Sequence, residues 1–438
     1  MRLDLLLSAL RAAPGVAQWR ITETVERRYE RYLTFLEVES ERRTAATRWQ
    51  VWLALESQAG ATGSVHGEAG FTIGSSEDSD ALVERVRTAL DAAAAAPNPE
   101  WSLPAPGEAG TALPPSDPAA SCDGGLLSDP DAVLDALVEE FSAAVPAAVR
   151  PSTLELFATI SDRRLLNHRG LDLRDRSTLL YAEWVLLYRP ENRDEVEFFD
   201  RIEAARAIDL RLAERVAAAA ACVRDGATAI APTAGLQPVI ITGPYVAALM
   251  SWFATHCDAA QHVRKINALR EGEPVLIRRS GEPLDLLSDP SVPSLSAYAF
   301  DPDGYAPCRQ DLLCGDVLVG LHGAGRWMQR LGRPPHGSLG TLVMAPGATP
   351  LSELRSGALE VVRFSEFHPR SDTGAFSGEI RLAYLHHPDG TRSAITGGSV
   401  SGTLREALTA SRSCSELQTI EGFHGPKALR LEAVMVTK

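Results

Sequence analysis

The densest group of side chains that could bind a metal or move a proton spans residues 256–262. His256, Cys257, Asp258 and His262 bring imidazole, thiol and carboxylate groups together. On a helix, two ligands share one face when they are three or four residues apart. His256 and His262 are six apart, which leaves them roughly 120° from a common face. The spacing therefore favours polar residues that close the end of a helix over a metal site.

A second group of reactive types is Phe364-Ser-Glu-Phe-His368. In a strand, Glu366 and His368 would point to the same face because alternate side chains do so. Such a pair could serve chemistry that needs no zinc, or it could be two solvated loop charges. Further on, His386-His-Pro-Asp-Gly390 has a pattern typical of a hairpin turn at the surface.

The element that would position a hydrolytic centre is an apolar strand and turn over residues 236–245, followed by a helix over residues 246–257. A zinc peptidase needs two His and a Glu on one helical face. Here that face consists of Ala, Leu, Met, Trp and Phe. Without imidazole ligands no Lewis acid lowers the pKa of a bound water from about 15.7 towards roughly 7. Hydrolysis by this helix is not expected.

Composition indicates which classes of protein this chain can belong to. A chain of 438 residues with 45% hydrophobic residues is expected to form two or three globular domains. The net charge of -14 argues against binding of a nucleic-acid backbone. Six scattered cysteines without C-x-x-C spacing, and a start without signal-peptide features, predict reduced thiols in a cytoplasm. No apolar run approaches the roughly 18 to 20 residues that a membrane-spanning helix needs.

The pattern of elements predicts an α+β fold, with N-terminal mixed α/β units followed by a β-rich, barrel-like C-terminal domain. We expect a first α/β unit over residues 1–95 and a second over residues 126–230. The Pro-, Gly-, Ser- and Ala-rich residues 96–125 between them read as a linker or long loop that buries little apolar surface. The C-terminal domain covers residues 231–438.

Several local predictions go with this division. Strands are expected over residues 17–25, 29–39 and 45–56 of the first unit, and over residues 152–161, 165–171 and 177–188 of the second. A long helix is predicted over residues 194–224, and shorter helices over residues 245–260, 315–331 and 403–410.

Taken in order, segments after the apolar helix resemble the third domain of the TldD/TldE (PmbA) family. They are Glu271-Gly-Glu-Pro-Val-Leu276, Phe300-Asp-Pro-Asp-Gly304, Asp311-Leu-Leu-Cys-Gly-Asp-Val-Leu318, Gly347-Ala-Thr-Pro-Leu-Ser-Glu-Leu354, Asp372-Thr-Gly-Ala-Phe-Ser-Gly-Glu-Ile380 and Gly397-Gly-Ser-Val-Ser-Gly402. Residues 161–170 and 70–74 extend the resemblance over nearly the whole chain. One departure is Leu166-Asn-His-Arg-Gly170, where the family usually has Asn-Ser-x-Gly.

The resemblance also implies which subunit type this chain is. The family's D-type subunit carries HExxxH on the helix and a later Cys as third zinc ligand, whereas the E-type subunit lacks the motif and pairs with it. Counting back from Gly272 along the family spacing puts the two His positions near Ala248 and Phe253 and the Glu position near Leu249. The chain is therefore similar to the E-type. Cys414 falls roughly at the thiolate position, and a vestigial or buried thiol is the favoured interpretation.

For function, the resemblance implies a non-catalytic subunit with no metal or catalytic residue of its own, and zinc only in a TldD-like partner. Glu366, His368 and Asp372 fall in a segment that lines the cleft in the family, so we expect them to contact substrate, an unfolded or leader peptide. Two alternatives stay open. The chain could be a self-contained enzyme of specialised metabolism that uses no zinc, or a homodimeric peptide-binding protein without catalysis.

Overall fold

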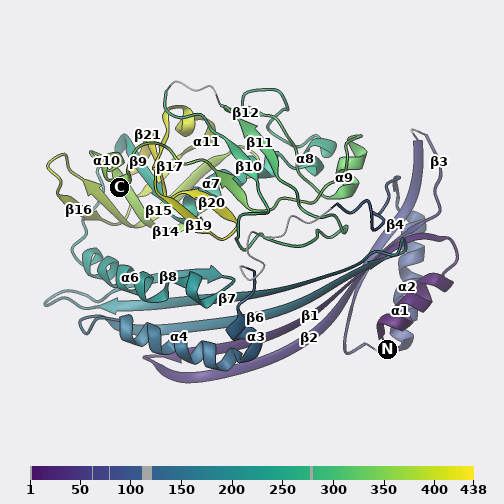
Figure 1. Cartoon of the computed structure of the whole chain (residues 1–438). Coiled ribbons are helices and arrows are strands. Elements are labelled where there is room, and N and C mark those ends of the chain that lie inside the picture. The colour runs from purple at the N-terminus through teal and green to yellow at the C-terminus, as the bar shows by residue number, and fades with distance from the viewer. Residues whose placement is uncertain (1, 62, 78, 111–120, 277–279) are drawn as a thin grey trace.

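The structure is a computed structural model that describes residues 2–61, 63–77, 79–110, 121–276 and 280–438. It confirms the predicted α+β class. Long antiparallel strands form a curved layer, and a β-rich domain containing a closed barrel lies above it (Figure 1). Among the helices of the described ranges, none combines the length and the apolar character needed to cross a membrane.

The long strands belong to one eight-stranded sheet of the described residues, in the order β3-β4-β2-β1-β6-β7-β8 with β5 paired to β4. Its strands are β1 (Val16–Thr34), β2 (Glu37–Leu55), β3 (Gln58–Gly60), β4 (Gly63–Gly74), β5 (Pro97–Pro99), β6 (Arg150–Asn167), β7 (Asp172–Tyr188) and β8 (Val196–Ala204). The strands of both predicted N-terminal units therefore pair in one sheet, joined by the antiparallel β1–β6 ladder. The domain boundaries stay a prediction.

The helices described are mostly short. They are α1 (Arg2–Ala12), α2 (Ser79–Ala95), α3 (Gly124–Ser128), α4 (Pro130–Ala144), α5 (Ala207–Leu210), α6 (Leu212–Gly226), α7 (Pro244–His256), α8 (Ala259–Arg264), α9 (Gly325–Arg330), α10 (Leu351–Leu354) and α11 (Leu404–Ala407). Cys122, Cys222, Cys257, Cys308, Cys314 and Cys414 are all free thiols.

The faces of the long sheet have different neighbours. Trp19 and Ile21 of β1 share a core with α1 and α2, and Leu33 of the same strand shares a core with α4. All three positions are odd-numbered, so both helical groups cover one face of the sheet. Even-numbered positions face the C-terminal domain, where the Arg20 guanidinium contacts the Asp303 carboxylate. The long sheet thus lies between helices α1, α2 and α4 and the C-terminal domain, whereas α6 contacts that domain directly through Asp225 and Tyr384.

Four local predictions were wrong. The strands expected at residues 17–25 and 29–39 are one strand, β1, which ends at Thr34, because its ladders with β2 and β6 run through residues 26–28. The strands expected at residues 152–161 and 165–171 are one strand, β6, because the ladder with β1 runs through the gap between them. The helix expected over residues 194–224 begins with a strand, β8, since Phe198 and Ile202 pack into the sheet core while residues 196–204 pair with β7. The helix expected over residues 315–331 is limited to α9.

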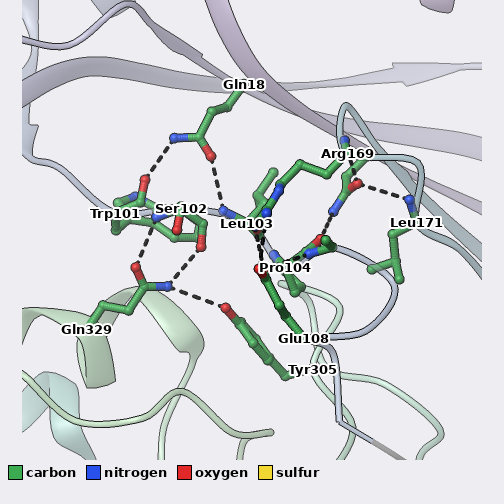
Figure 2. Close-up of polar contacts among 12 residues, drawn as sticks. Gln18, Trp101, Ser102, Leu103, Pro104, Glu108, Arg169, Leu171, Tyr305 and Gln329 are labelled. Atoms are coloured by element: carbon green, nitrogen blue, oxygen red, sulfur yellow. Dashed lines mark hydrogen bonds and ion pairs between the residues drawn. The ribbon is translucent and has the colours of Figure 1, made fainter.

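The predicted linker is anchored over residues 97–110. Trp101 and Leu103 are 3% and 0% exposed, so the expectation of little apolar burial was wrong there. The Gln18 side chain donates to Trp101 O at 2.8 Å and accepts from Leu103 N at 3.0 Å (Figure 2). Gln329 of α9 makes the same two-bond contact with the Ser102 backbone, at 3.0 and 2.8 Å. The rest of the predicted linker includes residues 111–120, which lie outside the described residues.

Two sheets build the C-terminal domain. The six-stranded one has the order β12-β11-β10-β13-β20-β19. Its strands are β10 (Leu286–Ser288), β11 (Gln310–Cys314), β12 (Val317–Leu318), β13 (Leu342–Met344), β19 (Leu417–Ile420) and β20 (Phe423–Pro426).

The seven-stranded sheet has the order β14-β9-β21-β17-β15-β16, with β18 paired to β21. Its strands are β9 (Gly235–Thr242), β14 (Leu359–Phe367), β15 (Ala375–His386), β16 (Arg392–Ile395), β17 (Ser399–Thr403), β18 (Arg412–Ser413) and β21 (Ala428–Thr437). An additional β14–β15 pairing closes five of these strands into a ring, which is the predicted barrel. Helix α7 shares its hydrophobic core with the barrel strands.

Candidate functional site

Helix α7 begins at a sharp turn out of β9. Gly243 has a φ of 61°, in the region that L side chains rarely adopt, and so permits the turn. Pro244 occupies the first helical turn, where its missing N–H costs no hydrogen bond. Most residues of the helix are buried, and its exposed residues, Ser251 and Thr255, lie four apart on one side. The sequence pattern therefore directs α7 into the barrel core.

The three positions where a D-type zinc helix would carry its ligands and base offer no donor atoms. Leu249 and Phe253 are 0% exposed, and Ala248 packs against the same core. Methyl, isobutyl and phenyl groups cannot coordinate zinc or accept a proton from a zinc-bound water. The residues present at α7 do not fit a zinc ion.

Aromatic rings fill the space beside the helix. Tyr245 packs edge-on against Phe364 with centroids 4.8 Å apart, and Trp252 packs edge-on against Phe253 at 5.0 Å. A Cβ at Gly374 would lie 3.2 Å from the Trp252 indole, so this glycine lets the loop approach the ring. The Trp252 Nε1–H donates to Arg370 O at 3.1 Å. The loop after β14 is thereby fixed onto α7.

The His256 side chain joins α7 to two other segments through hydrogen bonds. Its Nδ1 accepts from Ala268 N at 3.0 Å, so Nε2 carries the proton and donates to Ser371 O at 2.9 Å. Burial lowers the pKa of His256, which keeps the ring neutral. Both nitrogens are occupied, and neither is left for a metal.

Two further imidazoles bind carbonyls at the end of α7. His262 Nε2 donates to His256 O at 3.0 Å, and His322 Nε2 donates to Ala254 O at 2.8 Å. The last carbonyls of a helix lack intrahelical partners, and these side chains supply them. The interpretation of the residue 256–262 cluster as a helix closure is confirmed. The contribution of His322 was missed because it lies far along the chain.

The two cysteines near this site are buried. Cys257 and Cys414 are 0% exposed. Burial raises the pKa of the Cys257 thiol to about 12, and it also raises the pKa of Cys414. The Cys414 Sγ–H donates to Glu416 O at 3.3 Å. Thiols in such surroundings are inert, so the interpretation of Cys414 as a buried thiol is confirmed.

The three residues predicted to contact substrate lie in or beside the loop that α7 holds. Glu366 and His368 have side chains 84% and 80% exposed, with His368 Nε2 and Glu366 Oε1 4.0 Å apart. Asp372 pairs with Arg370 at 2.8 Å, and this hydrogen-bonded guanidinium lowers the pKa of Asp372 to about 2. All three carry accessible polar groups, and their role in binding substrate stays a prediction.

Sequence analysis missed a buried ionic group near the predicted His386–His387 turn. The hairpin itself is present, with His387 N donating to Thr391 O. His386, however, lies 2.6 Å through Nε2 from Glu360 Oε2, and Glu360 also accepts from Arg355 at 2.8 and 2.9 Å. The Glu360 side chain is 6% exposed. Its partners surround the charge, as a buried carboxylate requires.

Sequence analysis also missed the role of the Phe300-Asp-Pro-Asp-Gly304 segment. The Asp301 Oδ1 accepts from Asp303 N and from Tyr305 N, both at 2.9 Å. Burial raises the pKa of Asp301 to about 7, and neighbouring Asp303 adds to the shift. Phe300 O in turn accepts from Arg163 of β6 at 2.6 Å. This tight loop therefore joins the C-terminal domain to the long sheet.

Two cavities lie where the C-terminal domain approaches the long sheet. One of about 650 Å³ is lined by residues of β8, α5 and α6 on one side and of the β19–β20 hairpin on the other. The other, of about 540 Å³, includes Thr24, Arg163 and Tyr298. Neither cavity is lined by the three residues predicted to contact substrate.

No group of three or more His, Cys, Asp or Glu side chains is arranged to hold a metal ion within the part of the chain that the structure describes. Each of the three imidazoles around α7 donates to a main-chain carbonyl through Nε2.

Comparison with known proteins identifies a related domain and related folds. Residues 234–438 match the family model for the PmbA/TldA metallopeptidase C-terminal domain. A search of curated proteins gives no match. Three solved structures share the fold, each with 16% sequence identity and a TM-score of 0.77.

These structures align over almost the full length. A putative modulator of a DNA gyrase from Thermotoga maritima covers 100% of this chain and 99% of its own. TldE from Thermococcus kodakarensis covers 100% of both chains. A putative modulator of DNA gyrase from Bacteroides thetaiotaomicron covers 99% of this chain and 98% of its own. Residues 234–438 therefore form a PmbA/TldA metallopeptidase C-terminal domain, and the chain as a whole has the fold of these three structures.

Proposed function

We propose that this chain is the non-catalytic, E-type subunit of a heterodimeric TldD/TldE-type metallopeptidase. Its TldD-like partner holds the zinc ion and performs the hydrolysis. The chain described here completes a chamber that admits unfolded or leader peptides, and it acts in the cytoplasm. The long sheet and the barrel domain form its walls.

The observation that carries the proposal is the environment of α7. A helix that once held a metal but lost one ligand would keep other donors in a polar pocket. Here Leu249 and Phe253 are fully buried, and Phe364 of β14 packs against Tyr245 of the helix. Restoring a zinc site would require donors at three positions and would open the core around them.

The β19–β20 hairpin supports a peptide ligand. β19 is an edge strand of the six-stranded sheet, and its hairpin lines the cavity of about 650 Å³. Gln418 of β19 donates through Nε2 to Gly243 O at the start of α7, at 3.1 Å. An edge strand can pair with the extended backbone of an unfolded peptide. The edge thus offers a place for an unfolded chain beside α7.

Co-expression with a HExxxH homologue tests the proposal. We expect the two chains to co-purify as a 1:1 complex by light scattering after size exclusion, with about one zinc per heterodimer by elemental analysis. The complex should hydrolyse an unfolded peptide, and the chain alone should not. A partner with Gln in place of the motif Glu is the matched control, because it keeps the interface and removes the base.

Other outcomes separate the alternatives. If the two chains never co-purify and the partner cleaves equally well alone, the heterodimer is wrong. Turnover of a small substrate by the isolated chain in the presence of a chelator would identify a self-contained enzyme. A stable homodimer that binds peptide without turnover would identify a binding protein.

A further inference from the structure

Three arginines surround one indole at the junction of α8 and α9. The guanidinium carbons of Arg264, Arg326 and Arg330 lie 4.9, 4.5 and 4.8 Å from the centroid of the Trp327 ring. No two of them can therefore be further apart than twice the longest of these distances. Helices α8 and α9 lie side by side near the upper end of β4 (Figure 1). We call these four residues the Trp327 cluster.

The charge of the Trp327 cluster is poorly balanced. Arg330 approaches one carboxylate, Glu68, at 3.6 Å, and that carboxylate also accepts from the Trp101 Nε1–H. Arg264 and Arg326 make neither an ion pair nor a hydrogen bond with any residue that the structure describes. Three cations thus share one carboxylate. The electron-rich faces of an indole attract them only weakly, by about 0.5–1 kcal/mol each at exposed sites.

The cluster is also held in place. Gln329, between the arginines of α9, bonds to the N–H and the C=O of Ser102 and fixes the helix to the Trp101–Pro104 segment (Figure 2). The Arg330 side chain is 10% exposed and its Nε is buried without a hydrogen-bond partner among the described residues. Burial lowers the pKa of Arg330, and Arg326 and Arg264 lower it further. Arg264, in contrast, is open to solvent.

The geometry selects a class of ligand. Guanidinium groups bind carboxylate and phosphate oxygens through parallel N–H donors. A nucleic-acid backbone needs a long basic surface, whereas this cluster is compact and the chain as a whole carries a net charge of -14. One or two neighbouring carboxylates match the span of the cluster.

We infer that the Trp327 cluster is an anion-binding site for acidic side chains of an extended peptide. Arg264 and Arg326 supply donors that make no hydrogen bond to a described residue, Arg330 adds a buried charge, and the indole holds the three guanidinium groups together. The choice of a peptide rests on the proposed function. The site itself rests on the cluster's geometry and on its unbalanced charge.

Calorimetric titration of the full, isolated chain with hexaglutamate tests the inference, with hexaglutamine as the neutral peptide. We expect hexaglutamate alone to bind, and its Kd to rise with sodium chloride because exposed charges are screened. The double variant Arg264→Gln/Arg326→Gln should weaken binding by about tenfold or more. Arg85→Gln/Arg87→Gln on α2 is the matched control, since it removes the same charge elsewhere and should leave Kd unchanged.

Each other outcome overturns the inference. Absence of hexaglutamate binding removes the site. Equal weakening in both double variants shows that only net charge matters. Pyrophosphate that binds more tightly than hexaglutamate, with the same dependence on Arg264 and Arg326, assigns the site to phosphate instead of peptide. Thermal unfolding of each variant verifies its fold. No partner is present in this assay, so its result is independent of whether the heterodimer forms.

Discussion

The end of α7 and the Trp327 cluster both gather side chains that could bind a ligand, yet they differ in what is left to bind with. His256, His262 and His322 each donate to a main-chain carbonyl. Arg264 and Arg326 make no hydrogen bond or ion pair with a described residue, and their guanidinium groups lie over the Trp327 ring. The difference shows that residue type alone does not make a binding site. A binding site also needs donor groups that are not already hydrogen-bonded within the fold.

The largest change in stability is expected from a substitution in the core around α7. Phe253→Ala should lower the free energy of unfolding by about 3–5 kcal/mol, because a fully buried phenyl ring leaves a cavity that the barrel cannot fill. Urea unfolding followed by circular dichroism measures the change. Leu236→Ala is the control, since that side chain is 68% exposed and its loss should cost less than about 0.5 kcal/mol. If Phe253→Ala left the free energy of unfolding unchanged, the position would be an open pocket and not part of the packed core.

Asp301 is a carboxylate that, like the α7 imidazoles, is hydrogen-bonded to main-chain groups. Its pKa is raised to about 7 in the folded chain, so the folded state holds this proton more tightly than the unfolded state. The resulting stability is fully present below about pH 4 and is lost as pH rises towards 7. Asp301→Asn should remove that loss, worth up to about 4 kcal/mol, because an amide keeps the acceptor without ionising.

Urea unfolding at several pH values between about 4 and 8 measures the effect as the difference between Asp301→Asn and the parent chain. Asp372→Asn serves as the control, and its profile should run parallel to that of the parent chain over this pH range. The Asp372 pKa is lowered to about 2 by Arg370, so the stability it contributes is lost only in stronger acid. Parallel pH profiles for Asp301→Asn and the parent would contradict the assignment.

His256 tests the closure of α7 directly. His256→Ala leaves Ser371 O and Ala268 N without their partner, and we expect a loss of about 2–3 kcal/mol of unfolding free energy. His368→Ala should change stability by less than about 0.5 kcal/mol because its side chain is 80% exposed. If His256→Ala were as stable as the parent but changed the metal content of the purified chain, the imidazole would be a metal ligand and not a link between segments.

Local patterns were enough to predict part of this fold. The apolar run of α7, the helix-closing spacing of His256 and His262, and the β-rich character after residue 231 are properties of short segments, and the structure has all of them. The family segments in residues 271–402 could likewise be read without knowledge of contacts. These features depend on neighbours in the sequence.

What could not be predicted depends on distant pairing. β1 pairs with β6 across more than a hundred residues, and this ladder merges two expected units into one sheet. β8 alternates charged and aromatic residues weakly, and its pairing with β7 overrides the helical reading of residues 194–224. In the site, Arg264 reaches Trp327 only because α8 packs on α9. Sequence spacing shows Arg326 and Arg330 on one helix, but not the third cation.

The smallest expected change in stability is that of Arg264→Gln, and it tests directly whether the fold already uses this arginine. Arg264→Gln should change the unfolding free energy by less than about 0.5 kcal/mol, because the lost cation–π contact is offset by relief of repulsion from Arg326 and Arg330. Added sodium chloride screens that repulsion, so the parent should gain more stability with salt than the variant. Melting temperatures at low and high salt measure the difference, and Arg333→Gln, which breaks an ion pair with Glu271, should show the reverse trend. A loss above about 1 kcal/mol in Arg264→Gln would make the arginine a clamp between α8 and α9, already used by the fold as the imidazoles of α7 are.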